Sequence, residues 1–346
     1  MDKINVLSLF DGISCGRVAL NRAGVSYSNY FASEIDKYAI KVAQKNYSDT
    51  IQLGDIISWR DWNLPTIDLL IGGSPCQGFS NAGDGLNFSD PRSKLFFEFV
   101  NILKYLKPKF FLLENVKMKK EWQDIISEKV GVQPILINSS LVSAQNRKRL
   151  YWTNIPNITQ PEDKHIFLKD ILEYTNSIEA NKIRNKSKSI RVGGRSSPAN
   201  SKQEWDNVYI QGAAIRNQVT KRGIEEQLNI RKDEKSNCVV PTYPNKLNGV
   251  CIQVGEADIK GFDIVKRVYS PEGKSPSLTT MQGDHREPKV SEDNITWRKF
   301  TPIECERLQT LEDNFTEGIS NSQRYKCLGN GWTVDVIAHI FSFMKF

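Results

Sequence analysis

Residues 1–155 alternate short apolar runs, rich in β-branched and aromatic residues, with longer segments that carry apolar residues at helical spacing. This alternation predicts right-handed βαβ crossovers and a mainly parallel sheet that helices cover on both faces. Ligands of such sheets bind beyond the carboxyl ends of the strands, so the residues after each strand are the functional candidates. The predicted strands are 4–10, 29–34, 67–73, 109–115, 133–138 and 149–154, and the predicted helices are 16–24, 36–47 and 93–107.

The middle of the chain has a different composition. From about residue 179 to residue 290 it is rich in Gly, Pro, Asn, Ser and basic residues, with β-like pieces such as "GVCIQVG" and "DIVKRVY". This predicts a second, smaller and irregular β-rich domain. Helical patterns return at 301–311 and 331–344, and the last one places Val334, Ile337, Ala338 and Phe341 on one face. Because that face needs an apolar partner, we expect the chain to end by packing back on the first domain.

Composition excludes several classes of protein. The chain has 346 residues, 39% of them hydrophobic and 25% charged, with no apolar run of membrane-spanning length and no signal-peptide pattern. We therefore expect a globular, cytoplasmic protein. Its six cysteines form no CxxC pair, and only three histidines are present, so neither a zinc site nor a disulfide framework is expected.

The net charge of +7 is concentrated in one stretch. Between Asn181 and Lys202 the chain has seven basic residues and no acidic residue, which equals the whole net excess. Two interpretations remain open: a surface that binds a polyanion, or a solvated linker, which on charge alone is the commoner case. The basic residues are Lys182, Arg184, Lys186, Lys188, Arg191, Arg195 and Lys202.

Three strand ends carry residues typical of an adenosine-binding site. The motif "FDGISCG" follows the first strand, and its glycines at 12 and 16 allow a tight turn before a helix N-terminus. Glu34 follows the next strand, where a carboxylate can accept hydrogen bonds from a ribose diol. Asp55 of "GDI" can bind an adenine amino group. Each feature alone is more often a turn or a surface acid, but together they suggest an adenosine-containing ligand.

Cys76 lies in the stretch "LLIGGSPCQGFS", where an apolar run breaks into glycines. Pro75 stiffens the backbone before it, and Gly72, Gly73 and Gly78 let the loop bend sharply and leave room for a flat substrate. A lone cysteine is more often a buried, inert residue. A nucleophilic cysteine needs nearby positive charge, because the thiolate is the reactive form.

Neighbouring strand ends supply charged side chains, two of them positive. Glu114 lies in the run "LLENV", and Arg147 and Arg149 of "QNRKRLYW" project to the same side because side chains alternate along a strand. A cysteine, a carboxylate and two guanidinium groups would then meet at one edge of the sheet. This arrangement favours a reactive thiol at Cys76.

At these residues the chain closely resembles the DNA (cytosine-5) methyltransferases. The motifs occur in that family's order, from "FDGISCG" and Glu34 through "GGSPCQGFS", "ENV" and "QNRKRLYW" to "RKFTPIECERLQTL" and "GNGWTVDVI". The resemblance covers residues 1–155 and 297–346, and the middle only by position and by the likeness of "YSPEGKSPSLTT". One departure is that Ser14 and Cys15 stand where family members usually have adjacent glycines.

The resemblance implies an α/β fold: a Rossmann-like doubly wound mixed sheet of the class I S-adenosylmethionine-dependent methyltransferases, with a smaller, irregular β-rich target-recognition domain. It implies a catalytic domain at 1–178, target recognition at 179–296 and a return segment at 297–346 that completes the catalytic domain. The implied activity is methyl transfer from S-adenosyl-L-methionine to C5 of a cytosine flipped out of double-stranded DNA, with S-adenosyl-L-homocysteine as product and no metal. The implied context is a monomer, prokaryotic or phage-encoded, that belongs to or protects against a restriction-modification system.

The same resemblance assigns roles to individual residues. Cys76 adds to C6 of the cytosine, Glu114 binds or protonates N3, and Arg149, supported by Arg147, stabilises O2. The loop 77–94 closes over the flipped base. The implied cofactor contacts are Phe10, Asp11, Gly12, Ile13, Gly16, Glu34, Ile35, Asp55, Ile56, Pro75, Leu95, Asn330 and Trp332. The implied DNA contacts are Gln77, Ser80, Lys182, Arg184, Lys186, Lys188, Arg191 and Arg195.

The alternatives belong to different classes. A tRNA cytosine-5 methyltransferase of the same superfamily carries a characteristic Cys-Phe-Thr element that this sequence lacks. An inactive DNA-binding regulator usually loses the cysteine loop, whereas Cys76, Glu114 and Arg149 are intact here. A nucleotide-binding oxidoreductase would leave those three residues without a role. For "RKFTPIECERLQTL" the sequence favours a structural role, as a helix that docks the recognition domain.

Overall fold

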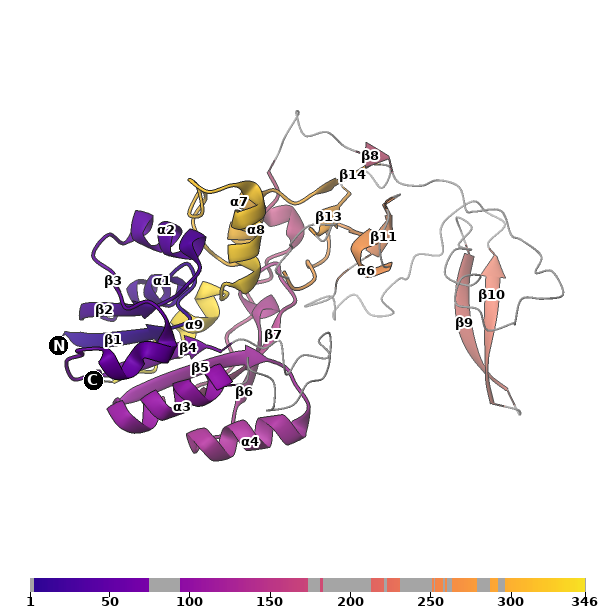
Figure 1. Cartoon of the computed structure of the whole chain (residues 1–346). Helices are drawn as coiled ribbons and strands as arrows, with labels where there is room; N and C mark the ends of the chain where they lie inside the picture. The colour runs from indigo at the N-terminus through magenta and orange to yellow at the C-terminus, as the bar shows by residue number, and fades with distance from the viewer. Residues whose placement is uncertain are drawn as a thin grey trace, which may run out of the picture.

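A seven-stranded sheet forms the centre of the computed structural model (Figure 1). Its strand order is β3-β2-β1-β4-β5-β7-β6; the pairs among β1 to β5 are parallel, and β7 runs antiparallel to β5 and β6. This order confirms the expected doubly wound mixed sheet, with the direction of winding reversed between β1 and β4. The strands are β1 (Ile4–Leu9), β2 (Tyr27–Ser33), β3 (Ile51–Gln52), β4 (Leu69–Gly73), β5 (Phe110–Val116), β6 (Ile135–Asn138) and β7 (Lys148–Thr153).

Several of the assigned residues lie outside the part of the chain that the structure describes. The described residues are 3–74, 94–173, 181–182, 213–220, 223–230, 251, 253–257, 259, 263–278, 287–291 and 296–345. Pro75, Cys76, Gln77 and Ser80 fall outside them, as do the basic residues from Arg184 to Lys202. The backbone of Lys182 is described, and it pairs with Thr296 on a neighbouring strand.

Helices cover both faces of the sheet, because successive side chains of each buried strand point to opposite faces. On β5, for example, Leu112 enters one apolar core and Leu113 enters the other. The first core receives α1 (Cys15–Arg22) and α2 (Lys37–Asn46), and the second receives α3 (Lys94–Leu106) and α4 (Lys120–Val130), which lie below the sheet in Figure 1.

Two elements of this domain, β3 and α4, are missing from the predicted strand and helix ranges. β3 has only two residues, which is too short for an alternating pattern to show. α4 has a detectable pattern, since Trp122, Ile126 and Val130 recur at intervals of four and are buried in one core. Gly131 ends this helix in the left-handed region, at φ 82°, where a residue without a Cβ atom is favoured.

The C-terminal segment returns to the central sheet, as the apolar face of its last helix predicts. Val334, Ile337 and Phe341 on α9 (Val334–Phe341) are fully buried in the same core as α1. An ion pair of 2.7 Å between Arg22 and Asp335 joins these two helices. Two further helices precede α9, namely α7 (Pro302–Leu308) and α8 (Asn321–Asn330).

The middle of the chain contributes strands, in line with its predicted β-rich character. A five-stranded sheet has the order β11-β12-β13-β14-β8, and β9 and β10 form a separate antiparallel pair. The stretch "DIVKRVY" differs from its predicted β-like conformation: its first four residues form the helix α6, and only its last three form a strand. The elements are β8 (Asn181–Lys182), β9 (Ala213–Thr220), β10 (Gly223–Ile230), β11 (Gln253–Glu256), α6 (Asp263–Lys266), β12 (Arg267–Tyr269), β13 (Lys289–Val290) and β14 (Thr296–Lys299).

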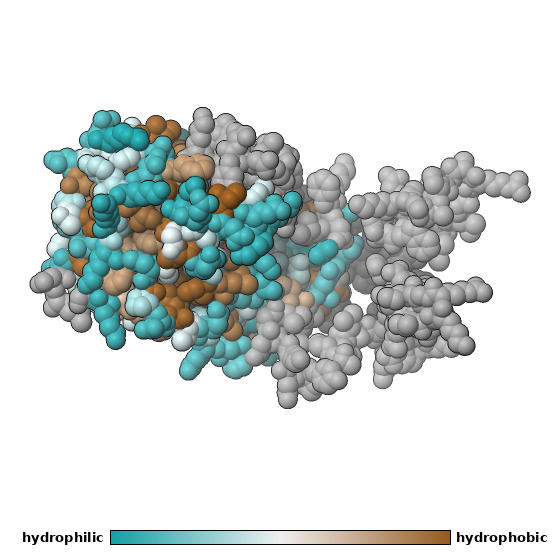
Figure 2. Space-filling view, turned by 90° about the horizontal axis from the view of Figure 1, so that it is seen from below, coloured by the Kyte–Doolittle hydropathy of each residue, from teal (hydrophilic) through white to brown (hydrophobic). Residues whose placement is uncertain are grey.

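The described surface is mixed in polarity. Seen from below, hydrophilic residues surround smaller apolar areas (Figure 2). Single large apolar side chains are also highly exposed, such as Tyr105 at 72% and Ile57 at 65%, which is ordinary for a protein surface. Within the described ranges, every helix lacks either the length or the apolar character that spanning a membrane requires.

A buried ion pair fixes the chain on both sides of the middle region. Arg298 donates from Nη1 and Nη2 to the two carboxylate oxygens of Glu304, at 2.9 and 2.8 Å. Glu304 lies on α7 and also accepts the backbone N–H of Glu173 at 2.9 Å. With Thr301 it forms a capping box at the helix N-terminus. α7 therefore ties together the two ends of the middle region, which agrees with the structural role that the sequence favours for this motif.

Replacing Arg298 by alanine should destabilise the fold by about 3–5 kcal/mol, because the fully buried Glu304 carboxylate loses its cation. Urea unfolding followed by circular dichroism measures the change. Lys120→Ala is the matched control: its ion pair with Asp124 is exposed, so its loss should change the free energy of unfolding by less than about 0.5 kcal/mol. Equal changes in the two variants would contradict the role given to the Arg298–Glu304 pair.

Candidate active site

The loop after β1 has an unusual backbone. Phe10, Gly12 and Ser14 all adopt the left-handed region, with φ angles of 57°, 58° and 61°. Two of these residues carry a Cβ atom, for which this conformation is unfavourable by roughly 1 kcal/mol or more. Such strain is concentrated at functional sites, and here it shapes the turn between β1 and α1.

Buried hydrogen bonds hold this loop. Asp11 is buried and accepts the hydroxyl of Tyr30 at 2.7 Å and that of Ser14 at 2.5 Å. Burial raises the pKa of Asp11, and hydrogen bonds from Ser14, Ser8 and Tyr30 oppose that rise. Because the Ser14 hydroxyl binds Asp11, it does not cap α1. The loop is therefore fixed by side chains that point into the protein.

Ser14 and Cys15 are the two positions at which the sequence departs from the family that it resembles. Ser14 adopts the left-handed conformation that glycine would favour, and its hydrogen bond to Asp11 stabilises it there. Cys15 is buried, and burial raises the pKa of its thiol to about 12. The thiol therefore stays protonated and unreactive at neutral pH.

Glu34 lies at the end of β2, beside this loop. Its Oε2 accepts the backbone N–H of Gly12 at 2.8 Å, and Oε1 accepts those of Ile35 and Asp36 at 2.7 and 2.8 Å. The carboxylate is therefore held rigidly, while Oε2 retains acceptor capacity for another donor. The side chain of Ile35 is 73% exposed. A fixed acceptor next to an exposed apolar side chain suits a ribose and its attached ring.

Asp55 follows β3, the next strand of the sheet. Its Oδ1 accepts the backbone N–H of Ile57 at 3.0 Å and caps a short 3₁₀ helix, while the residue as a whole is exposed. Ile56 is buried in the second core. Ser33, at the end of β2, donates to the carbonyl of Gly54 at 2.8 Å. The structure thus holds the two predicted acids at adjacent strand ends.

Other residues predicted for the cofactor site lie in the turn after β1, in α3, at the end of α8 and in the connection that follows α8. Ile13 is buried in the turn after β1. Leu95, in the first turn of α3, is half-buried and packs with Phe10 against the second core. Asn330 is exposed at the last position of α8, and Trp332 follows in the connection to α9.

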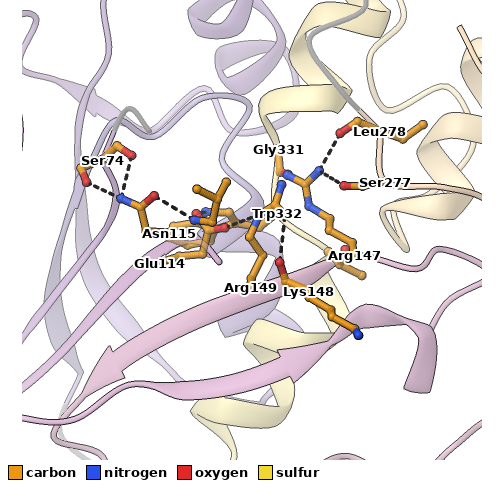
Figure 3. Close-up of polar contacts among 12 residues, drawn as sticks. Ser74, Glu114, Asn115, Arg147, Lys148, Arg149, Ser277, Leu278, Gly331 and Trp332 are labelled. Carbon is orange, nitrogen blue, oxygen red and sulfur yellow. Dashed lines mark hydrogen bonds and ion pairs between the residues drawn. The ribbon is translucent and has the colours of Figure 1, made fainter. Parts of the chain in front are cut away.

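Glu114, near the end of β5, forms an ion pair with Arg149 of β7 (Figure 3). Arg149 Nε lies 3.0 Å from Glu114 Oε1, and the two side chains are only 15% and 11% exposed. The strand register explains this contact, because Glu114 is paired with Tyr151, two residues after Arg149, and with Gly73 at the end of β4. Trp332 Nε1 donates to the other carboxylate oxygen, Oε2, at 3.2 Å.

Arg149 retains hydrogen-bonding capacity toward a ligand. Its Nη1 donates to the carbonyl of Lys148 at 3.0 Å, whereas Nε, although close to Glu114, is not aligned for a hydrogen bond. Nη2 makes no hydrogen bond to any residue that the structure describes. A guanidinium group with an available N–H beside a carboxyl group can bind a carbonyl oxygen of a substrate.

Arg147 has a different environment from Arg149. The sequence places both arginines on one side of an extended segment, and the structure separates their contacts. The Arg147 guanidinium is buried and holds main-chain oxygens on two other segments, one of them directly before Trp332 (Figure 3). Its acceptors are the carbonyls of Leu278 (2.8 Å), Gly331 (3.1 Å) and Gly329 (3.2 Å) and the hydroxyl of Ser277 (3.3 Å).

Asn115 is a functional candidate that sequence reasoning missed. Its Nδ2 donates to the hydroxyl of Ser74 at 3.0 Å and to the Ser74 carbonyl at 3.4 Å, and its Oδ1 accepts the N–H of Val116 at 2.8 Å. Ser74 is buried directly after β4, two residues before Cys76. Asn115 therefore anchors the end of β4 where the cysteine loop begins. An amide within the buried run "FFLLENV" is the signal that identifies it.

Known proteins match this chain over nearly its whole length. The family model for C-5 cytosine-specific DNA methylases matches residues 4–345. The orphan methyltransferase M.SPBetaI of Bacillus phage SPbeta is 30% identical, with 99% of this chain and 97% of that protein covered. The type II methyltransferase M1.ScrFI of Lactococcus lactis subsp. cremoris is 29% identical, with 97% of this chain and 76% of that protein covered.

Solved structures share the fold at lower sequence identity. The Entamoeba histolytica methyltransferase EhMeth has a TM-score of 0.61 at 17% identity, with 99% of this chain and 98% of that chain covered. The S. pombe Dnmt2 methyltransferase has a TM-score of 0.57 at 16% identity, with the same coverage of 99% and 98%. These likenesses support the mixed, doubly wound sheet described above.

Proposed function

Because this chain belongs to the C-5 cytosine-specific DNA methylase family, we propose that it is a DNA (cytosine-5-)-methyltransferase that acts on double-stranded DNA. The observation that carries the proposal is the Glu114–Arg149 pair, which lies at the carboxyl edge of the sheet beside the end of β4. The chain continues from that strand end to Cys76, and covalent geometry keeps its Cα within about 7.6 Å of the Cα of Ser74. A thiol, a carboxyl group and a guanidinium group can therefore act on one base.

The pocket after β1, β2 and β3 suits S-adenosyl-L-methionine, which supplies the methyl group when bound. Glu34 has the free acceptor capacity that ribose hydroxyls need, and its carboxylate is fixed by three backbone N–H groups. Asp55 exposes a carboxylate for the adenine amino group. Phe10 and Ile35 offer apolar surface for the adenine ring, and the Trp332 indole packs against Gly16 and Gly73.

The first step makes cytosine C5 nucleophilic. The Cys76 thiolate forms a bond to C6, and the electrons of the C5=C6 bond move through C4 onto N3. In its protonated form Glu114 gives a proton to N3, and Arg149 stabilises the charge at O2 through its available N–H. The product is an enamine whose C5 would form a bond to the methyl carbon as the bond from that carbon to the sulfonium sulfur breaks, with S-adenosyl-L-homocysteine as the leaving group.

The second step restores the aromatic base. C5 now carries both the methyl group and its original hydrogen. That hydrogen leaves as a proton to solvent, its bonding electrons re-form the C5=C6 bond, and the C6–S bond breaks to return the Cys76 thiolate. Glu114 takes back the proton from N3, so the enzyme leaves the cycle as it entered.

DNA binding is proposed for the middle region and for the loop after β4. The target carbon is hidden in the stacked duplex, so the base must be flipped out at a cost of a few kcal/mol. The six basic residues from Lys182 to Arg195 would hold phosphates, and together with Lys202 they equal the net charge of +7. Gln77 and Ser80, close to Cys76 in sequence, would contact the DNA around the flipped base.

The names of two relatives support a biological setting. One is named as an orphan methyltransferase of a phage and another as a bacterial type II methyltransferase. We therefore place this enzyme in a restriction-modification system or in protection against one. It would act as a monomer on DNA in the cytoplasm of a bacterial cell.

Bisulfite sequencing of DNA from cells that express the chain tests the proposed function. Protected cytosines are expected at one recurring sequence, and they should be absent from cells without the gene. The same treatment of tRNA from these cells tests the tRNA alternative: modification of tRNA with none in DNA would overturn the proposal. DNA binding without any methylation would instead identify an inactive regulator.

A further inference from the structure

Trp332 lies between the two halves of the site. It is half-buried in the connection between α8 and α9, and its indole packs over two glycines. A Cβ atom at Gly73 would lie 2.8 Å from Trp332 Nε1, and a Cβ atom at Gly16 would lie 3.3 Å from Cζ3. The indole therefore reaches from the end of β4, beside the cytosine-directed residues, to the first turn of α1, beside the cofactor pocket.

The main chain on both sides of Trp332 is fixed. The carbonyl of Gly331 accepts from Arg147 Nη2 at 3.1 Å and from Gln309 Nε2 at 3.2 Å. On the other side, the hydroxyl of Thr333 donates to Gln309 Oε1 at 2.9 Å. All three of these side chains are buried. The indole therefore projects from a backbone that has little freedom to move.

The Glu114 carboxyl group is held at both of its oxygens. Arg149 pairs with Oε1 at 3.0 Å, and the Trp332 indole N–H donates to Oε2 at 3.2 Å. Gly73 makes this approach possible, since a Cβ atom there would also lie 3.0 Å from Glu114 Oε2. An ion pair at Oε1 and a hydrogen bond at Oε2 together restrict the rotation of the carboxyl group (Figure 3).

We propose that Trp332 is a positioning residue for Glu114, an inference that rests on the proposed function. Its indole N–H fixes the orientation of the carboxyl group that exchanges a proton with cytosine N3. Sequence resemblance assigns Trp332 to the cofactor pocket, and the geometry extends its role to the base. Because the same indole packs on Gly16, the shape of the cofactor turn and the orientation of Glu114 are coupled.

The first test is Trp332→Phe, which keeps an aromatic ring and removes the N–H donor. Single-turnover methyl transfer at saturating DNA and S-adenosyl-L-methionine should slow about 10-fold, because the carboxyl group loses the hydrogen bond that orients it. The Kd for S-adenosyl-L-methionine should stay within about twofold. Trp152→Phe is the matched control: Trp152 donates its indole N–H to Ser127 at 2.9 Å on the opposite face of the sheet, so the rate should not change.

A double-mutant cycle separates positioning from a cofactor role. In a Glu114→Gln background no proton passes from this side chain to N3, so its orientation no longer affects that transfer and adding Trp332→Phe should slow the remaining methyl transfer by less than about twofold. An equal loss in the two backgrounds would overturn the proposal. A loss of S-adenosyl-L-methionine affinity as large as the loss of rate would overturn it too, because Trp332 would then act through the cofactor.

Gly73→Ala gives a second variant, in which both the Trp332 and the Glu114 side chains are chemically unchanged. Its added Cβ atom forces apart Trp332 Nε1 and Glu114 Oε2, which would lie 2.8 and 3.0 Å away. We expect a loss of rate similar to that of Trp332→Phe, and no further loss when the two changes are combined. Fully additive losses would overturn the proposal.

The proposed function and this inference fail in different ways. A wild-type chain that transfers no methyl group to DNA removes the proposed function, and the positioning role with it. A wild-type chain that methylates DNA, with a Trp332→Phe variant of equal rate, removes the positioning role alone.

Discussion

Cys76→Ala is expected to abolish methyl transfer, with a rate below about one ten-thousandth of that of the wild type. Without the thiolate no bond forms at C6, and C5 of an unactivated cytosine does not attack the methyl group. The residues proposed to bind the cofactor follow β1, β2 and β3, so the Kd for S-adenosyl-L-methionine should stay within about twofold. Transfer of a radioactive methyl group to DNA measures the rate, and isothermal titration measures the affinity.

Cys251→Ala serves as the control, since Cys251 is a half-buried thiol that the proposed mechanism does not use. Its rate should equal that of the wild type within about twofold. Methyl transfer retained in the Cys76→Ala variant would contradict the covalent mechanism. Loss of cofactor binding in that variant would show that the change disturbs the fold.

Glu114→Gln is expected to reduce single-turnover methyl transfer by about 10²–10⁴-fold, the range for loss of a proton-transferring group. Glutamine keeps the size of the side chain and can still accept from Trp332, but it supplies no proton to N3. It also removes the charge that pairs with Arg149. Quenched-flow measurement with DNA and cofactor in excess gives the rate of the chemical step.

The control for this variant is Glu317→Gln, because Glu317 is 66% exposed and pairs loosely with Lys45 at 3.6 Å. That change should leave the rate unaltered, since exposed pairs contribute little. If the Glu114→Gln variant kept the wild-type rate, a group other than Glu114 would supply the proton to N3. The Glu114–Arg149 pair would then be structural.

Most of the candidate site could be predicted from the sequence, because apolar runs show where the strands end. Glu34, Asp55 and Glu114 each follow or close an apolar run, and the topology of a doubly wound sheet brings such ends to one edge. The fold class was predictable for the same reason, since alternation of strands and helices specifies a parallel sheet. The short strand β3 could not be predicted from its pattern, because two residues are too few to show an alternation.

The contact between Trp332 and Glu114 could not be predicted, because 218 residues separate them and no spacing rule relates them. Sequence alternation also puts Arg147 and Arg149 on one side without showing what each one binds. In the structure Arg149 forms an ion pair with Glu114, whereas Arg147 donates a hydrogen bond to the carbonyl of Gly331. Long-range contacts of this kind depend on how the C-terminal helices pack back on the sheet.

Covalent trapping on DNA that contains 5-fluorocytosine tests the central claim most directly. Fluorine at C5 cannot leave as a cation, so after methyl transfer the C6–S bond should persist and join the enzyme to the DNA. Incubation with such duplexes and S-adenosyl-L-methionine should give a one-to-one adduct that survives denaturation, with the DNA on the peptide that contains Cys76. An enzyme that methylates ordinary DNA and forms no adduct, or that forms one in the Cys76→Ala variant, would contradict the mechanism.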